Sequence, residues 1–145
     1  MAFALKAAIA DTGARVFVLR AQKTMYGGKA IAAGDTVFIF ASENEGGPGL
    51  IARGIVTAAD HAGVKKPEGV ARYTPRVSIE VRRTATAKRP LGRDELRPFI
   101  GKGGPRGELA DRLYKQATNK IIALSDEAAA WLEGFLLTAS GLFIN

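Results

Sequence analysis

The sequence predicts an α+β domain, in which a mainly antiparallel sheet of five or six strands curls into a barrel flanked by two or three helices. In Arg76–Thr86 (RVSIEVRRTAT) apolar and polar residues alternate, so one face of that strand is buried and the other is wet. Thr36–Ala41 (TVFIFA) is apolar on both faces, which indicates a central strand. Ser125, with Asp126 and Glu127 after it, precedes apolar residues at helical spacing and predicts a capped amphipathic helix.

The first half of the chain contains three further β-compatible runs. The runs FALKAAIA and RVFVLRA are separated by DTGA, which predicts either a β-hairpin or two strands joined by a loop. Residues 50–58 are expected to return antiparallel to Thr36–Ala41, with Gly54 marking a bulge or a close backbone approach. The polar stretch that follows, interrupted by Pro67 and Pro75, predicts a long loop.

The second half alternates helical and extended segments. A short helical turn is expected after Pro90 and a flexible basic loop over residues 102–107. Residues 108–118 predict a helix with Leu109, Leu113 and Ala117 facing inward. Residues 120–124 (KIIAL) are short and β-branched, which suits a final strand.

Length and charge indicate one compact domain with an anionic partner. A chain of 145 residues most economically forms a single domain over residues 1–145. The net charge is +7, and residues 61–120 carry fifteen Lys and Arg against six Asp and Glu. Such a field favours a polyanion, of which nucleic acid is the commonest. A solubilising surface is the alternative interpretation of the same charge.

Composition also excludes several classes of site. Cysteine is absent, which excludes disulfides and thiolate metal sites, and with one histidine a zinc site is not expected either. No phosphate-binding glycine motif occurs in context, so no cofactor is predicted. No segment is apolar for the roughly 18 residues that span a bilayer, so we expect a cytoplasmic protein without a membrane partner.

The polar loop after Thr36–Ala41 is the most specific candidate for a site. Its glycines and Pro48 are enough to turn the chain, which leaves Ser42, Glu43 and Asn44 unexplained as turn residues. Because they stand at the end of a strand buried on both faces, we interpret them as one wall of a binding pocket. The alternative is a solvated acidic loop.

Four segments in succession resemble the EVE domain of the PUA-like superfamily, which is related to the ASCH and YTH domains. They are KAIAAGDTVFIFAS, GPGLIARGIVTAA, YTPRVSIEVRRTATAKRPLGRDELRPF and NKIIALSDEAAAWLEGFL, and they cover the chain from about Lys29 to Leu137. The resemblance implies a single EVE/PUA-like domain with a pseudobarrel fold. It also implies a cleft that recognises a modified or flipped base of DNA or RNA.

This resemblance guides the choice of binding residues. The expected cleft residues are Arg20, Lys23, Tyr26, Ser42, Glu43, Asn44, Tyr73 and Lys120. Tyr26, Phe40 and Tyr73 are the candidates for stacking on a base. The basic segment from Arg72 to Arg97 would follow the phosphate backbone. No catalytic residue is predicted on this interpretation.

Two alternatives stay open. The ASCH relatives suggest a small hydrolase of an acylated nucleoside, with Lys23 or Glu43 as general base, but the adjacent Lys23 and Thr24 point to opposite faces of a strand. The third interpretation is a non-catalytic protein-interaction domain. The terminal residues Leu142, Phe143 and Ile144 would either cover the barrel or form a homodimer contact.

Overall fold

The structure is a computed structural model that describes residues 1–61 and 75–137. In that part of the chain the strands are β1 Ala2–Ala7, β2 Val16–Met25, β3 Thr36–Ala41, β4 Gly49–Asp60, β5 Arg76–Thr86 and β6 Lys120–Ala123. The helices are α1 Arg93–Leu96, α2 Gly104–Leu109 and α3 Asp126–Glu133. Short 3-10 turns are η1 Gly28–Ala30, η2 Glu43–Glu45 and η3 Arg97–Phe99, and α2 continues into a π-helical turn, η4 Ala110–Tyr114.

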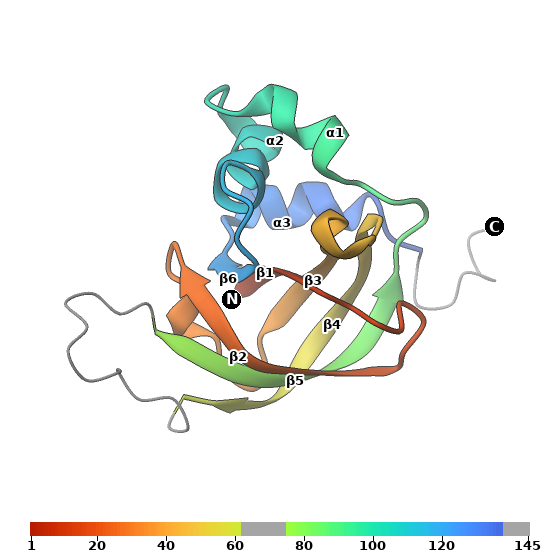
Figure 1. The fold of residues 1–145 in the computed structure, drawn as a ribbon, viewed down its shortest axis with the longest axis vertical. Helices are drawn as coiled ribbons and strands as arrows, with labels where there is room; N and C mark the ends of the chain where they lie inside the picture. Colours follow the sequence, from red (N-terminus) through yellow and green to blue (C-terminus); the bar gives the residue numbers. More distant parts are fainter. Residues whose placement is uncertain (62–74, 138–145) are drawn as a thin grey trace.

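The strands form a closed barrel in the order β1-β3-β4-β5-β2-β6 (Figure 1). Strand β1 runs parallel to β3, and β2 runs parallel to β6, while the other four pairings are antiparallel. The β2–β6 seam is short, with only Thr24 opposite Ile121 and Met25 opposite Ile122. The fold is therefore α+β with a curled, mainly antiparallel sheet, as the sequence predicts.

The helices cover one side of the barrel and leave the other side open (Figure 1). The interior of the barrel holds one core, which includes Phe3, Leu5, Phe17, Ile39 and Val81. A second core lies between the outer faces of β1, β3 and β6 and the helices, and includes Phe38, Phe40, Leu109, Leu113 and Leu132. Strand β3 contributes to both cores, which explains why TVFIFA is apolar on both faces.

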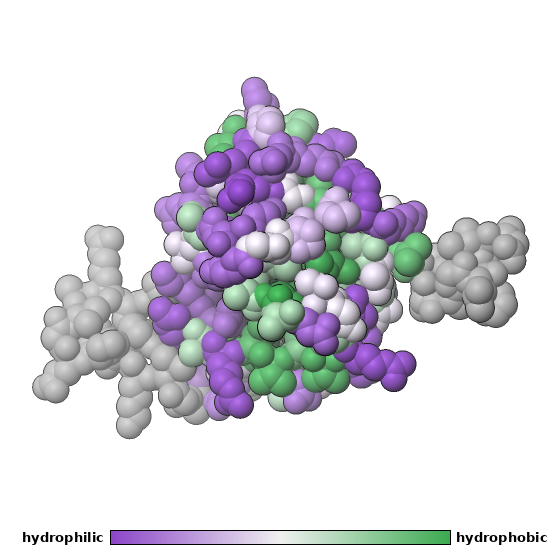
Figure 2. Space-filling view, turned by 45° about the vertical axis from the view of Figure 1, so that its right-hand side comes forward, coloured by the Kyte–Doolittle hydropathy of each residue, from purple (hydrophilic) through white to green (hydrophobic). Residues whose placement is uncertain are grey.

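Buried and exposed residues alternate in the strands that lie away from the helices. These strands are β2, β5 and the C-terminal half of β4. On β5, Val77, Ile79 and Val81 are buried, whereas Glu80 and Arg82 are exposed. Val16 and Val18 on β2 are 49% and 59% exposed. In Figure 2 most of the hydrophobic surface lies in the middle and lower part of the view, between hydrophilic residues, and the upper part is mainly hydrophilic.

Most strand predictions are confirmed, and the bulge at Gly54 is confirmed by the register shift between Arg53 and Gly54. A Cβ on Gly54 would meet Val81 Cγ1 at 2.4 Å, so the approach between β4 and β5 is also close. The hairpin alternative for β1 and β2 is wrong, because β6 lies between them. The loop predicted around Pro67 and the terminal apolar residues lie outside the described residues.

The helical predictions need two corrections. The basic loop at residues 102–107 is shorter than expected, because α2 already begins at Gly104. Ala117 is exposed, since the helix ends at Tyr114 and does not extend to residue 118. The caps are as predicted, with Ser125 Oγ accepting the Ala128 N–H at 3.1 Å and opening α3.

No helix in the described residues is both long and apolar enough to cross a lipid bilayer.

Candidate functional site

The polar residues after β3 form a small pocket between the barrel rim and the helical layer. Strand β3 ends at Ala41, and η2 turns the chain so that three consecutive polar side chains meet α1 and η4. The cavity has a volume of about 30 Å³, close to the space of one water molecule. It is lined by Lys6, Ser42, Glu43, Asn44, Arg93, Arg97, Tyr114, Gln116 and Ala117.

Glu43 joins the barrel to the helices. Its Oε2 accepts the backbone N–H of Arg93 at 2.7 Å and the hydroxyl of Tyr114 at 3.1 Å. A Cβ on Gly92 would lie 2.5 Å from the same oxygen, so the carboxylate packs directly against the chain before α1. Burial and the neighbouring Glu43 carboxylate raise the pKa of the Tyr114 phenol, which keeps it protonated as a donor.

Asn44 spans the mouth of this pocket. Its Nδ2 donates to the Ala117 carbonyl at 3.1 Å, and its Oδ1 accepts from the Arg93 guanidinium at 3.1 Å. Both hydrogen bonds are exposed to solvent. Such bonds contribute little net free energy, about 1 kcal/mol each, so the mouth is held by weak contacts.

Two buried lysines complete the end of the helical layer. Lys6 Nζ donates to the Leu113 carbonyl at 2.8 Å, and Lys120 Nζ donates to the Thr118 carbonyl at 3.2 Å. Leu113 lies in the last turn of η4 and Thr118 follows it, and backbone acceptors at the end of a helix have no helical partner. Burial lowers the pKa of Lys6. Burial, followed by the charges of Lys6 and Lys23, lowers the pKa of Lys120 to about 8.

Ser42 lacks the hydrogen bond that its burial demands. Its side chain is 1% exposed, and its Oγ has no hydrogen-bond partner within the described residues. A hydroxyl carries one donor and two acceptor positions, and leaving them all unused in the interior costs about 1–3 kcal/mol. A polar atom of this kind that faces a pocket is a natural position for a ligand group.

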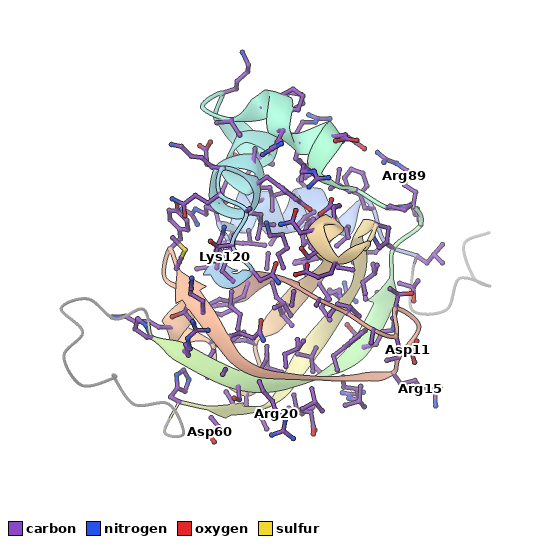
Figure 3. All side chains as sticks on the ribbon, viewed as in Figure 1. Asp11, Arg15, Arg20, Asp60, Arg89 and Lys120 are labelled. Atoms are coloured by element: carbon purple, nitrogen blue, oxygen red, sulfur yellow. The ribbon has the colours of Figure 1, made fainter. Side chains whose placement is uncertain are left out.

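The structure brings together only part of the predicted cleft. Ser42, Glu43 and Asn44 share the pocket, but Arg20 lies on the exposed outer face of β2, well away from Lys120 (Figure 3). Tyr26 is half exposed beside Arg112, whose Cζ lies 5.8 Å from its ring. Arg20 and Tyr26 are thus not among the residues that line the pocket with the loop, and β2 is irregular between Leu19 and Gln22, where Ala21 has a positive φ.

The remaining predicted residues fall into three groups. Lys23 and Lys120 are close enough for their charges to interact, and neither is among the residues that line the pocket, whereas Glu43 is. Phe40 is fully buried against Tyr114 and offers no free face for stacking, which corrects its assignment as a cage residue. Tyr73 lies outside the described residues.

Six pocket residues were not among the predicted cleft residues, namely Lys6, Arg93, Arg97, Tyr114, Gln116 and Ala117. Lys6 had a usable signal, since it is the one charged residue in an otherwise apolar strand. Tyr114 had none, because the π turn buries both Leu113 and Tyr114 and breaks the normal helical spacing.

The fold and site define a class of small barrel domain, in which a helical layer closes over one wall and leaves a polar pocket at the rim. No family model matches the chain, and a search of curated proteins finds no match either. Solved structures do match it in fold, as follows.

The DUF55 domain of human thymocyte nuclear protein 1 superimposes with a TM-score of 0.61 at 14% identity, over 92% of this chain and 97% of that one. Human THYN1 in complex with 5-methylcytosine-containing DNA matches with a TM-score of 0.60 at 12% identity, over 92% and 95% of the two chains. A hypothetical protein from Leishmania major matches with a TM-score of 0.58 at 17% identity, over 92% of each chain. At these identities the likeness establishes the fold alone.

Proposed function

We propose that this chain is a nucleic-acid-binding domain of the EVE (DUF55) type, and that the pocket beside Ser42 receives one base turned out of its strand. The observation that carries the proposal is the buried, unpartnered hydroxyl of Ser42. The net charge of +7 and the similarity in fold to a human protein solved with 5-methylcytosine-containing DNA support it. A modified cytosine is the first ligand to test.

The chemistry of the pocket suits the edge of a base. Cytosine presents an amino donor, and carboxylates are suitable acceptors for that group. The Glu43 carboxylate has lone pairs beyond those used by Arg93 and Tyr114. Ser42 offers a hydroxyl and Lys6 an ammonium group on the same lining, so donors and acceptors are both available.

Entry of a base requires the mouth to open, because a cavity of about 30 Å³ holds no more than a water molecule. Release of the two Asn44 hydrogen bonds frees the Asn44 side chain from Ala117 and from the Arg93 guanidinium, while Glu43 keeps η2 bonded to the Arg93 N–H. That cost, about 1 kcal/mol for each bond, is comparable to or smaller than the few kcal/mol needed to unstack a base. Opening at Asn44 is therefore the conformational step that we assign to binding.

Fluorescence anisotropy with short labelled oligonucleotides tests the proposal. DNA and RNA strands with one 5-methylcytosine, and matched strands with cytosine, are titrated at low ionic strength. We expect tighter binding of a modified strand, and a loss of about three- to tenfold in that affinity for Ser42→Ala, the value of one neutral hydrogen bond. Thr57→Ala, which removes an exposed hydroxyl on β4, is the matched control and keeps wild-type affinity.

Absence of binding to every DNA and RNA strand would overturn the proposal. If wild type and Ser42→Ala bound the modified strand with equal affinity, the Ser42 pocket would not be the site that receives the base.

A further inference from the structure

A second, wider hollow lies outside the pocket, where β2 begins and β5 ends. Its volume is about 620 Å³, within the range of sites that take small ligands or segments of polymers. We refer to it as the Arg15 groove. It is lined by Arg15, Val16, Arg82, Arg83, Thr84, Ala85, Thr86 and Leu137.

The groove presents two arginines that the fold does not use. Arg15 and Arg82 are exposed, and among the described residues neither forms a salt bridge or a side-chain hydrogen bond. Glu80, on the same face of β5 as Arg82, instead accepts the Thr57 hydroxyl at 2.9 Å. These two guanidinium groups, one directly before β2 and one on β5, suit an anion with several oxygens.

Arg83 has a different role, because it shapes the groove. Its Nε donates to the Ala14 carbonyl at 2.8 Å and its NH1 to Thr86 Oγ1 at 3.0 Å, and its NH2 contacts the Thr12 carbonyl. These bonds fix the turn that carries Arg15. Arg83 is thus a positioning residue, committed to the protein itself.

The other lining groups favour an organic anion over a simple ion. Thr86 Oγ1 accepts from Arg83, so its own O–H remains available to donate. Val16 is 49% exposed and Leu137 is 44% exposed, and both provide apolar surface beside the charges. Phosphate oxygens next to the C–H groups of a sugar match this combination of groups.

The groove and the Ser42 pocket occupy the same rim of the barrel. The end of β3 pairs with the start of β4 (Ala41 opposite Gly49), and the start of β4 pairs with the end of β5 (Ala52 opposite Thr86). The chain then runs from Thr86 past Lys88 and Arg89 to Arg93 in the pocket wall. Arg15 and Arg89 lie on the same side of the molecule in Figure 3.

We infer that the Arg15 groove binds the phosphodiester backbone of the strand whose base enters the Ser42 pocket. This inference rests on the proposed function and adds a second contact to it. The groove contributes affinity that is independent of base identity, since it meets phosphates, whereas the pocket contributes discrimination.

The double variant Arg15→Gln/Arg82→Gln tests the groove, because both side chains are exposed and their loss leaves the core intact. We expect affinity for single strands to fall at least about tenfold, with modified and unmodified strands affected equally. The plot of log affinity against log salt should become shallower by about 0.7 for each lost phosphate contact. Lys102→Gln, which removes an exposed charge from the loop before α2, is the control and leaves the slope unchanged.

Each outcome decides between the groove and the pocket. An unchanged affinity and salt slope in the double variant would overturn the groove, whatever the pocket does. A shallower slope in a protein that shows no preference for a modified base would support the groove and count against the base pocket. A mononucleotide and an unlabelled oligonucleotide can be compared as competitors for the labelled strand. If both competed equally well, the groove would be a site for single nucleotides, and the inference that it binds the backbone of a strand would be wrong.

Discussion

The two walls of the barrel use their outer faces differently. The wall formed by β1, β3 and β6 lies under the helices, and residues that would point to solvent in an isolated sheet, such as Ala4, Phe38 and Lys6, are buried there. No helix of the part of the chain that the structure describes covers the wall formed by β2, β5 and the end of β4, and its outward residues include Val18, Arg20 and Arg82.

The two walls also differ in how they accommodate charged side chains. Every charge on the covered wall is bonded to the protein, as Lys6 is to Leu113 and Glu43 is to Arg93 and Tyr114. On the open wall Arg76 and Arg83 are bonded to the backbone, but Arg82 is exposed, forms no such bond among the described residues and is available to a partner. The covered wall therefore suits a selective pocket, and the open wall suits contact with a polyanion.

The largest expected effect is on the free energy of unfolding, and it distinguishes the densely packed covered wall from the open wall. Phe38→Ala removes a fully buried ring between β3 and the helices and should lower the free energy of unfolding by about 3–5 kcal/mol. Val18→Ala, on the open wall, should change it by no more than about 0.5 kcal/mol. Urea unfolding measures both, and similar losses would mean that the open wall is covered in solution.

A smaller effect on the free energy of unfolding is expected when a carboxylate bonded inside the protein, Glu43, is compared with an exposed one, Glu95. Glu43→Gln should cost about 1–3 kcal/mol in urea unfolding, because it replaces the charged acceptor of the Arg93 N–H and the Tyr114 hydroxyl with a neutral amide, whose NH2 group can accept from neither. Glu95→Gln breaks only the exposed pair with Arg89 and should fall within the scatter of surface substitutions. A Glu43→Gln protein as stable as wild type would contradict the role of Glu43 as a link to the helices.

The smallest effect concerns pH. The pKa of Lys120 is lowered to about 8 from its ordinary 10.5 by burial and by the charges of Lys6 and Lys23, while Glu43 faces Lys6 and opposes the same shift there. The unfolded chain then binds more protons than the native chain above pH 8, so stability should rise with pH between about 8 and 9.5, by on the order of 1 kcal/mol.

Urea unfolding across that pH window measures the effect, and Lys120→Met should flatten the dependence. Above about pH 10 the opposite contribution enters, because the raised pKa of Tyr114 keeps its proton in the native state while the unfolded phenol ionises. A wild-type stability that falls between pH 8 and 9.5 would contradict the assignment.

Local pattern predicted most of the strands but little of their arrangement. The alternation in β5 is readable because one face meets water, and TVFIFA is readable as buried on both faces. The pairing of β1 with β3 and β6 was not readable, because neither partner adjoins β1 in the chain and no turn signal records a parallel pair.

The candidate site was predicted in its loop and missed in its other walls. Ser42, Glu43 and Asn44 follow a strand directly, so their position could be inferred from the chain around them. Lys6, Arg93 and Tyr114 reach the same pocket from three separate elements, and only the closure of the barrel and the π turn bring them together.

The pairing of β1 with β6 has a consequence for the order of folding. Lys6 contacts Leu113 across 107 residues of chain, and the barrel cannot close until β6 is present. Bringing residues so far apart in the chain together costs conformational entropy before any contact forms between them. Folds that depend on such contacts therefore fold slowly. During synthesis β1 remains without its second neighbour until β6 has been made, so the closed barrel is completed late in the growth of the chain.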